Sequence, residues 1–196
     1  IRDVERSRGL GDVYKRQRAV YKLKEINEKF KILKNGIHIV DLGAAPGSWS
    51  QFVSRNFKNS KIVSIDIKEM EDIENIHQIK GDFTDELQQK KIIDYFDSKI
   101  DVVISDMAVN TTGNKNVDAI VTGELAMESI EFAKEILKIN GQFVTKIFMG
   151  SSFNEIVSKS KKYLQETKKS DSKYPKTSFS FSHVGEDQII ILSSNV

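Results

Sequence analysis

Four charged side chains fall in predicted β-strands or at their ends, where a buried sheet cannot hold them without partners. Asp41, Asp66 and Asp106 each follow a short apolar run, and Lys146 lies within the apolar strand predicted over residues 142–148. A lysine in such a strand must be paired or functional, unless strand alternation points it outward. Because parallel strands share one crevice at their carboxyl ends, Asp106 and Lys146 are expected to meet there. An amine beside a carboxylate at that place is a candidate for proton transfer.

The stretch from Ile37 to Trp49, IHIVDLGAAPGSW, predicts a buried strand, a turn of small residues and the start of a helix. This layout is typical of a nucleotide-type cofactor pocket, although it also fits a plain structural corner. A dinucleotide site favours G-x-G-x-x-G, which lets the backbone approach a pyrophosphate. Here the glycines are Gly43 and Gly47, with Pro46 before the second. The spacing therefore favours S-adenosyl-L-methionine, which carries no phosphate.

Two further acids are placed to bind the adenosine part of such a cofactor. Asp66 ends the strand predicted over residues 61–67, roughly 20 residues past the glycine turn, where a carboxylate accepts hydrogen bonds from a ribose diol. Asp82 lies in the predicted turn Gly81–Phe83, from which an acidic side chain could reach an adenine amino group. Asp41 is expected beside the same ligand.

The elements that must position these residues alternate regularly between strand and helix patterns. This alternation predicts a mostly parallel α/β sheet with one reversed strand near the end. The predicted strands cover residues 37–42, 61–67, 76–79, 100–105, 142–148 and 187–193. The predicted helices cover residues 18–32, a segment from about 48 to 57, and residues 85–96, 118–137 and 153–166.

Composition excludes several kinds of site. The 196 residues include no cysteine, which rules out disulfides, thiolate metal sites and cysteine nucleophiles, and no cluster of His and carboxylates has metal-ligand spacing. No apolar run reaches membrane-spanning length and no secretory signal precedes the fold, so a cytoplasmic enzyme is expected. We expect one domain over residues 18–196, preceded by a disordered or non-native basic arm over residues 1–17.

Basic residues concentrate in two places. Residues 1–35 hold eleven Lys and Arg against five Asp and Glu, and lysines cluster again between residues 159 and 176. Two basic patches on a chain of net charge +2 suit an anionic polymer, although a solvated lysine-rich surface is the simpler interpretation.

Five segments, in this order, resemble the FtsJ/RrmJ family of ribose 2′-O-methyltransferases, of the RlmE type. They are Arg18–Leu23 (RAVYKL), Asp41–Trp49 (DLGAAPGSW), Gly81–Phe83 (GDF), Ser105–Asn110 (SDMAVN) and Lys146–Gly150 (KIFMG). The resemblance covers about residues 18–166 and implies a Rossmann-like class I S-adenosylmethionine-dependent methyltransferase fold. In that fold a mostly parallel seven-stranded sheet carries helices on both faces. The implied reaction is 2′-O-methylation of a uridine ribose in large-subunit (23S-type) ribosomal RNA.

The resemblance also implies a Lys-Asp-Lys-Glu catalytic tetrad. Lys22, Asp106 and Lys146 occupy its first three places, and Glu186 is assigned to the fourth by its position beside the final strand. Phe179 stands where the family has an arginine, which departs from the family's RNA contacts. The predicted cofactor residues are Asp41, Gly43, Gly47, Trp49, Asp66, Asp82 and Asp106.

The chemistry of ribose methylation fits these residues. A ribose hydroxyl is a weak nucleophile, so the enzyme must align it with the activated methyl group and remove its proton. We assign proton handling to Lys146 and its orientation to Asp106, while Lys22 and Glu186 shape the site and hold the ribose. The assignment requires no metal.

Other functions remain compatible with the sequence. A ribose methyltransferase for transfer RNA or a messenger cap would carry the same tetrad, and a non-catalytic RNA-binding protein could use the same fold. A nicotinamide-dependent oxidoreductase predicts a G-x-G-x-x-G that is absent. The expected partner is ribosomal RNA within the large subunit, bound by a monomer without membrane contact.

Overall fold

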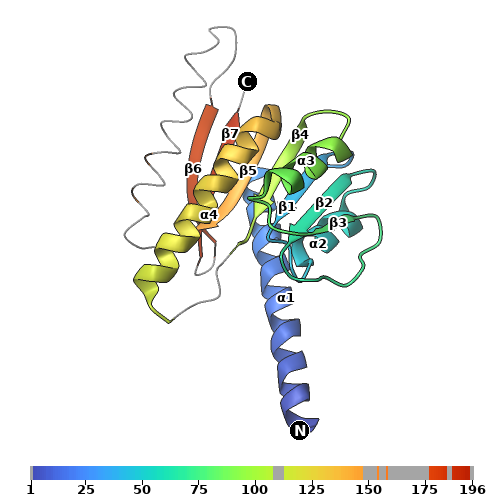
Figure 1. Cartoon of the computed structure of the whole chain (residues 1–196), viewed down its shortest axis with the longest axis vertical. Helices are drawn as coiled ribbons and strands as arrows, with labels where there is room; N and C mark the ends of the chain where they lie inside the picture. Colours follow the sequence, from blue (N-terminus) through green and yellow to red (C-terminus); the bar gives the residue numbers. More distant parts are fainter. Residues whose placement is uncertain are drawn as a thin grey trace.

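The computed structural model describes residues 2–107, 113–147, 177–184 and 187–194, together with the single positions 154 and 158 (Figure 1). Its centre is a seven-stranded sheet in the order β3-β2-β1-β4-β5-β7-β6. The strands are β1 (His38–Leu42), β2 (Lys61–Asp66), β3 (His77–Lys80), β4 (Ile100–Ser105), β5 (Leu137–Ile147), β6 (Thr177–Val184) and β7 (Asp187–Ser194). Strands β1 to β5 pair in parallel, and β7 is antiparallel to both β5 and β6. The expected mostly parallel sheet with one reversed strand is confirmed.

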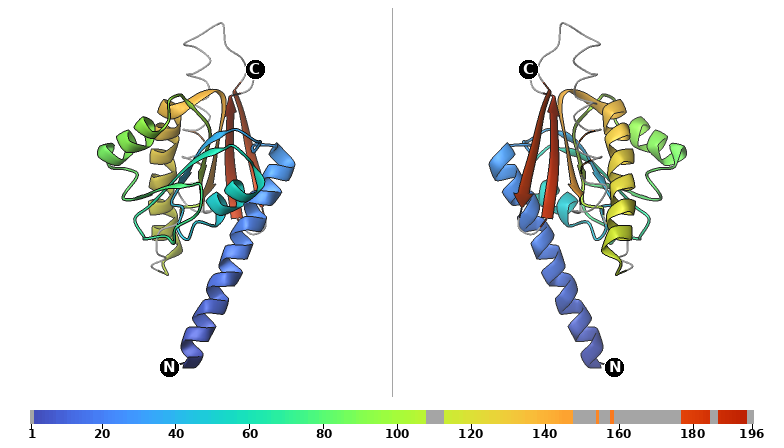
Figure 2. Two further views of the ribbon diagram at one scale, coloured as in Figure 1. Left: turned by 90° about the vertical axis from the view of Figure 1, so that its right-hand side faces the viewer. Right: turned by 90° about the vertical axis from the view of Figure 1, so that its left-hand side faces the viewer.

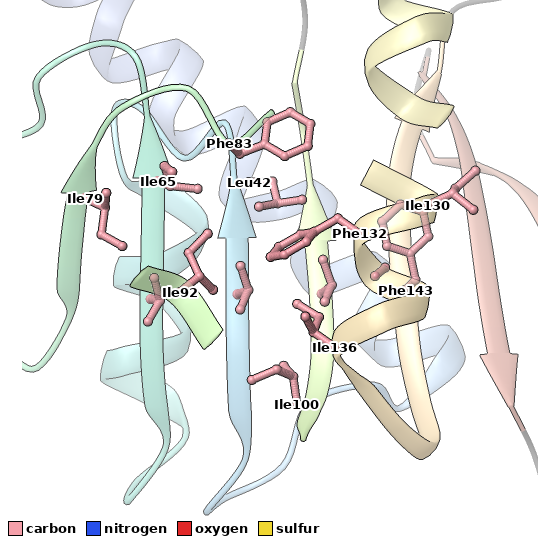
Figure 3. Close-up of a cluster of buried hydrophobic side chains, with 14 of the residues drawn as sticks. Leu42, Ile65, Ile79, Phe83, Ile92, Ile100, Ile130, Phe132, Ile136 and Phe143 are labelled. Carbon is pink, nitrogen blue, oxygen red and sulfur yellow. The ribbon is translucent and has the colours of Figure 1, made fainter. Parts of the chain in front are cut away.

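Helices cover both faces of the sheet (Figure 2). They are α1 (Arg2–Phe30), α2 (Ser48–Asn56), α3 (Glu86–Tyr95) and α4 (Lys115–Ile136). Strand residues alternate between the faces: Ile39 packs with Leu23 of α1 and Val53 of α2, whereas Val40 packs with Ile92 of α3 and Ile130 of α4. Figure 3 shows the second of these clusters, between the sheet and the pair α3 and α4. Both layers exclude water from the sheet, so its polar residues gather at the strand ends.

Strand register brings the predicted site residues to one edge of the sheet. Leu42 of β1 lies opposite Ser105 of β4, and Ser105 lies opposite Thr145 of β5. Asp106 and Lys146 directly follow these two residues and are therefore neighbours across the same edge. Within the described parts of the chain, no helix has the length and apolar character needed to span a bilayer.

The N-terminal segment differs from its expected structure. Residues 2–17, predicted as a disordered arm, continue helix α1, which projects beyond the carboxyl edge of the sheet (Figure 1). The segment contains Gly9 and Gly11 but no proline, and each interior glycine costs a helix only about 1 kcal/mol. That this segment is non-native stays a prediction.

Two strands differ from expectation near the end of the sheet. Strand β6 was not predicted, because the neighbouring lysine-rich composition outweighed the alternation of Ser and Phe in TSFSFSHV. Strand β5 begins at Leu137, before the predicted turn Asn140–Gly141, where its pairing with β4 shifts register. The helix predicted over residues 153–166 lies outside the described residues.

Candidate active site

Asp106 lies between two lysines that come from different parts of the fold. Lys146 Nζ is 2.5 Å from Asp106 Oδ1, and Lys22 Nζ is 3.6 Å from Asp106 Oδ2. Lys146 also donates to the backbone carbonyl of Asp106 at 3.4 Å. Only 10% of each lysine side chain and 21% of the Asp106 side chain are exposed. One carboxylate therefore orients two ammonium groups in a partly desolvated place, where such charges attract more strongly than in water.

Each lysine is positioned by the apolar residues beside it. In β5, Val144 and Ile147 are buried on either side of Lys146, which is itself 9% exposed. The alternative in which strand alternation turns Lys146 toward water is thus ruled out. In α1, Leu23 and Ile26 are fully buried against the sheet, and this packing fixes the helix so that Lys22 reaches Asp106.

A cavity of about 410 Å³ opens beside Asp106 at the carboxyl edge of the sheet. Among the residues that line it are Gly43, Asp66, Asp82, Phe83, Asp106 and Met107. The predicted cofactor residues Gly43, Asp66, Asp82 and Asp106 are thus brought together around one space. Three carboxylates on its walls disfavour a phosphate-bearing ligand by like-charge repulsion.

Gly43 cannot be replaced by a larger residue without movement of the cavity wall. Its φ is +69°, a left-handed conformation that favours glycine, and a Cβ there would lie 2.1 Å from Met107 Cγ. Gly43 and Ala45 also donate hydrogen bonds that hold the turn to β2: Gly43 N to the Ile65 carbonyl at 2.9 Å, and Ala45 N to Asp66 Oδ2 at 2.9 Å. These hydrogen bonds hold the glycine turn against β2.

The two acids predicted to bind adenosine are held by local hydrogen bonds. Asp66 Oδ1 accepts from Lys68 N at 2.8 Å, in addition to the bond from Ala45. Asp82 Oδ1 accepts from Thr84 N at 3.0 Å and from Thr84 Oγ1 at 2.9 Å. Because a carboxylate can accept about four hydrogen bonds, both groups keep capacity for a ligand.

Asp41 lies behind the cavity instead of lining it. The side chain is buried, and Asp41 Oδ2 accepts a hydrogen bond from Ser50 Oγ at 2.6 Å, while Ser50 Oγ lies 2.6 Å from Ser64 Oγ. Burial raises the pKa of Asp41 to about 7, against the lowering effect of the Ser50 hydrogen bond, and the charge of Asp106 adds to the rise. In this structure, Asp41 joins β1 to α2 and β2.

Trp49 and Gly47, also predicted as cofactor residues, do not line this cavity either. Trp49 is buried, and its Nε1 donates to the Ala19 carbonyl at 2.7 Å, which ties α2 to α1. Gly47, at φ +91°, lines a second cavity on the other side of the turn. Elsewhere at this end of the sheet, Asp85 caps α3, because its Oδ1 accepts from Leu87 N at 2.9 Å.

Several residues of the first cavity were not predicted from the sequence. Ile67, Lys68 and Leu125 line the cavity. Ile67 and Lys68 directly follow the predicted cofactor residue Asp66, and this adjacency could have indicated that they line the cavity. No sequence pattern indicated that Leu125 of α4 does so. Glu186 lies outside the described residues. Among the described residues, no group of His and carboxylates could hold a metal ion.

Comparisons with known proteins agree with this geometry. The profile of the FtsJ-like methyltransferase family matches residues 15–181. A Pelagibacter ubique protein named ribosomal RNA large subunit methyltransferase E is 59% identical over 180 residues, covering 86% of this chain and 89% of the relative. A relative of the same name from Rickettsia akari is 47% identical over 152 residues, covering 74% of this chain and 67% of the relative.

Solved structures share the fold. A Plasmodium falciparum crystal structure described as a ribosomal RNA methyltransferase superposes with a TM-score of 0.71 at 29% identity, covering 89% of this chain and 94% of the other. Fibrillarin from Aeropyrum pernix, solved with natively bound S-adenosyl-L-methionine, superposes with a TM-score of 0.54 at 16% identity, covering 81% and 67% of the two chains. At that identity the second similarity concerns the fold alone.

Proposed function

The chain belongs to the FtsJ-like methyltransferase family, and from this premise we propose that it methylates the 2′-hydroxyl of a uridine ribose in large-subunit (23S-type) ribosomal RNA, with S-adenosyl-L-methionine as donor. The observation that carries the proposal is the placement of Lys22 and Lys146 on one carboxylate, Asp106, at the wall of the cofactor-sized cavity. The names of the curated relatives support the large-subunit substrate.

The first cavity suits S-adenosyl-L-methionine because the cavity wall is acidic and offers hydrogen-bond acceptors. Asp66 and Asp82 offer carboxylates to a ribose diol and an adenine amino group, and Gly43 keeps the wall free of a side chain. S-adenosyl-L-methionine contains a cationic sulfonium and no phosphate, which agrees with the acidic lining of the cavity. When bound, this cofactor supplies an activated methyl group.

Lys146 would remove the proton of the attacking ribose hydroxyl. To act as a base, Lys146 must first lose its own proton, after which Nζ can accept the proton of the hydroxyl, and the contact with Asp106 Oδ1 fixes where Nζ points. Lys22, on the other carboxylate oxygen, would hold the substrate ribose. We assign Glu186 to the fourth place of the tetrad. The remaining rate enhancement comes from alignment of the hydroxyl with the methyl group.

The basic character of α1 supports an RNA substrate. Arg18 and Lys24 lie within four residues of Lys22 in α1, and cations at such positions attract phosphates. We place the reaction in the cytoplasm, on the RNA of the large ribosomal subunit, with a monomeric enzyme.

The decisive experiment supplies the chain with methyl-labelled S-adenosyl-L-methionine and ribosomal particles from a strain that lacks this activity. The expected result is label in large-subunit RNA, at one uridine, in a dinucleotide that resists alkali because its 2′-oxygen is methylated. Label in a base, in transfer RNA or in a messenger cap would overturn the substrate assignment. RNA binding without methyl transfer would leave the non-catalytic RNA-binding alternative.

A further inference from the structure

We propose that the second cavity binds a nucleobase of the RNA substrate, stacked on Tyr21, beside the ribose that is methylated. The inference rests on the proposed function and adds a base-binding site to it. The cavity has a volume of about 360 Å³ and lies between α1, the turn that starts α2, and the loop after β2. Its lining includes Arg16, Gln17, Tyr21, Ser48, Gln51 and Glu71.

Tyr21 is an exposed aromatic residue next to a buried catalytic candidate. Its exposed fraction is 68%, whereas only 10% of the Lys22 side chain is exposed. Adjacent residues of a helix point about 100° apart and their Cα atoms differ by about 1.5 Å in rise. Because Lys22 reaches toward Asp106, Tyr21 faces the neighbouring cavity and α1 joins the two places. A base on Tyr21 and a ribose at Lys22 would therefore be held by adjacent residues of α1.

The charges around this cavity favour a neutral base over a phosphate. Arg16 forms an ion pair with Glu71 at 3.4 Å, and Asp72 also lines the space. The two carboxylates outweigh the single guanidinium, so an anion would be repelled. Gln17 and Gln51 each carry an amide that can donate and accept, as the edge of a base requires.

Ser48 contributes to the wall of this cavity at the start of α2. Ser48 is 8% exposed and lines the cavity, and its Oγ is a buried polar atom with no hydrogen-bond partner within the described part of the chain. The nearby wall is closely packed, since a Cβ on Gly47 would lie 2.4 Å from Ile73 Cδ1. RNA bases are commonly read in this way, unstacked and placed on an aromatic side chain.

The test measures RNA affinity of the cofactor-loaded chain, with a large-subunit RNA fragment that contains the methylated uridine. Stacking of one base on an aromatic side chain contributes about 1–3 kcal/mol, so Tyr21→Ala should raise the RNA Kd about 5- to 150-fold. Tyr21→Phe keeps the ring and should bind like the unaltered chain. Ile93→Ala, on an exposed position of α3 far from both cavities in sequence, is the matched surface control.

Two further readouts separate stacking from electrostatic binding. Tyr21→Ala should shift the Kd equally at all salt concentrations, because stacking releases no counterion, whereas loss of a phosphate contact lowers the slope of log Kd against log salt. RNA that carries 5-iodouridine beside the target should photocrosslink to the peptide that contains Tyr21. An unchanged Kd in Tyr21→Ala, an equal loss in Tyr21→Phe, or crosslinks confined to other peptides would overturn the inference.

The same experiment distinguishes an error in the base site from an error in the proposed function. If the unaltered chain methylates the RNA and Tyr21→Ala binds it equally well, only the base site is wrong. If the unaltered chain neither binds nor methylates the RNA, the proposed function is wrong and the base site is wrong with it.

Discussion

The amine of Lys146 and the carboxylate of Asp106 lie 2.5 Å apart, although 40 positions separate the two residues in the chain. The contact exists because β4 and β5 are parallel neighbours in register, and each residue follows one member of the pair Ser105 and Thr145. With Lys22 on the other oxygen, the carboxylate fixes the direction of two amines at the edge of the cofactor cavity.

Replacement of Lys146 by alanine should abolish most of the activity while leaving the cofactor site intact. General base catalysis contributes about 10²- to 10⁴-fold, so the single-turnover rate of Lys146→Ala should fall within that range. The affinity for S-adenosyl-L-methionine, measured by calorimetry, should stay close to that of the unaltered chain. A variant with full activity and normal cofactor affinity would show that Lys146 is not the base.

Lys22 and Lys146 should be energetically coupled, because both contact Asp106. In a double-mutant cycle, the loss of activation free energy in the Lys22→Ala, Lys146→Ala double variant should differ from the sum of the two single losses by about 0.5–3 kcal/mol. Single-turnover rates of the four proteins give this coupling. Lys24→Ala is the charge-matched control, since Lys24 pairs with Glu28 at 3.9 Å on the exposed side of α1. Strict additivity would mean that the two lysines act independently.

Gly43→Ala should damage the cofactor cavity, and Gly36→Ala provides the matched comparison. Both glycines have positive φ, at +69° and +74°, but a Cβ on Gly43 meets Met107 Cγ whereas a Cβ on Gly36 meets nothing within 4 Å. Overpacking costs about 1–3 kcal/mol, so Gly43→Ala should lose that much more stability in urea unfolding. It should also weaken cofactor binding, which Gly36→Ala should leave unchanged. Equal losses in the two variants would rule out the contact with Met107 as the cause.

Asp41→Asn should remove a pH dependence of stability. The carboxyl has an ordinary pKa of 3.8 in the unfolded chain and about 7 in the folded protein. Between these values the folded state binds more protons than the unfolded state, so the free energy of unfolding falls as pH rises toward 7. The free energy of unfolding of Asp41→Asn, relative to that of the unaltered chain, should therefore rise by roughly 2–3 kcal/mol between pH 5 and pH 8. Asparagine can still accept the Ser50 hydrogen bond, which makes the exchange conservative.

Urea unfolding of both proteins at several pH values checks this prediction. Parallel stability curves would mean that Asp41 keeps an ordinary pKa in the folded protein. Ser50→Ala is a useful companion variant, because it removes the hydrogen bond that lowers the Asp41 pKa and should extend the fall in stability to higher pH.

The features of this protein that depend on local patterns could be predicted from its residues alone. Apolar strand runs, amphipathic helices and the glycine turn repeat over a few residues, and they predicted the parallel sheet and the crevice at its carboxyl edge. The same reasoning predicted that Asp106 and Lys146 meet, because parallel strands in one sheet end at one edge. The place of Lys22 in the tetrad followed from the resemblance to the FtsJ/RrmJ family, as no pattern near it indicates an approach to Asp106.

The directions of several side chains, in contrast, depend on how the layers pack and could not be predicted from local patterns. Asp41 belongs to the glycine motif, yet strand register directs it toward Ser50 and Ser64 and away from the first cavity. The Trp49 side chain is likewise directed away from the first cavity, because its Nε1 donates to the Ala19 carbonyl of α1. Tyr21 and Ser48 face a common cavity only because α1 lies beside the start of α2. These contacts join residues far apart in the chain, and their geometry depends on helix packing and strand register, which a local sequence pattern does not specify.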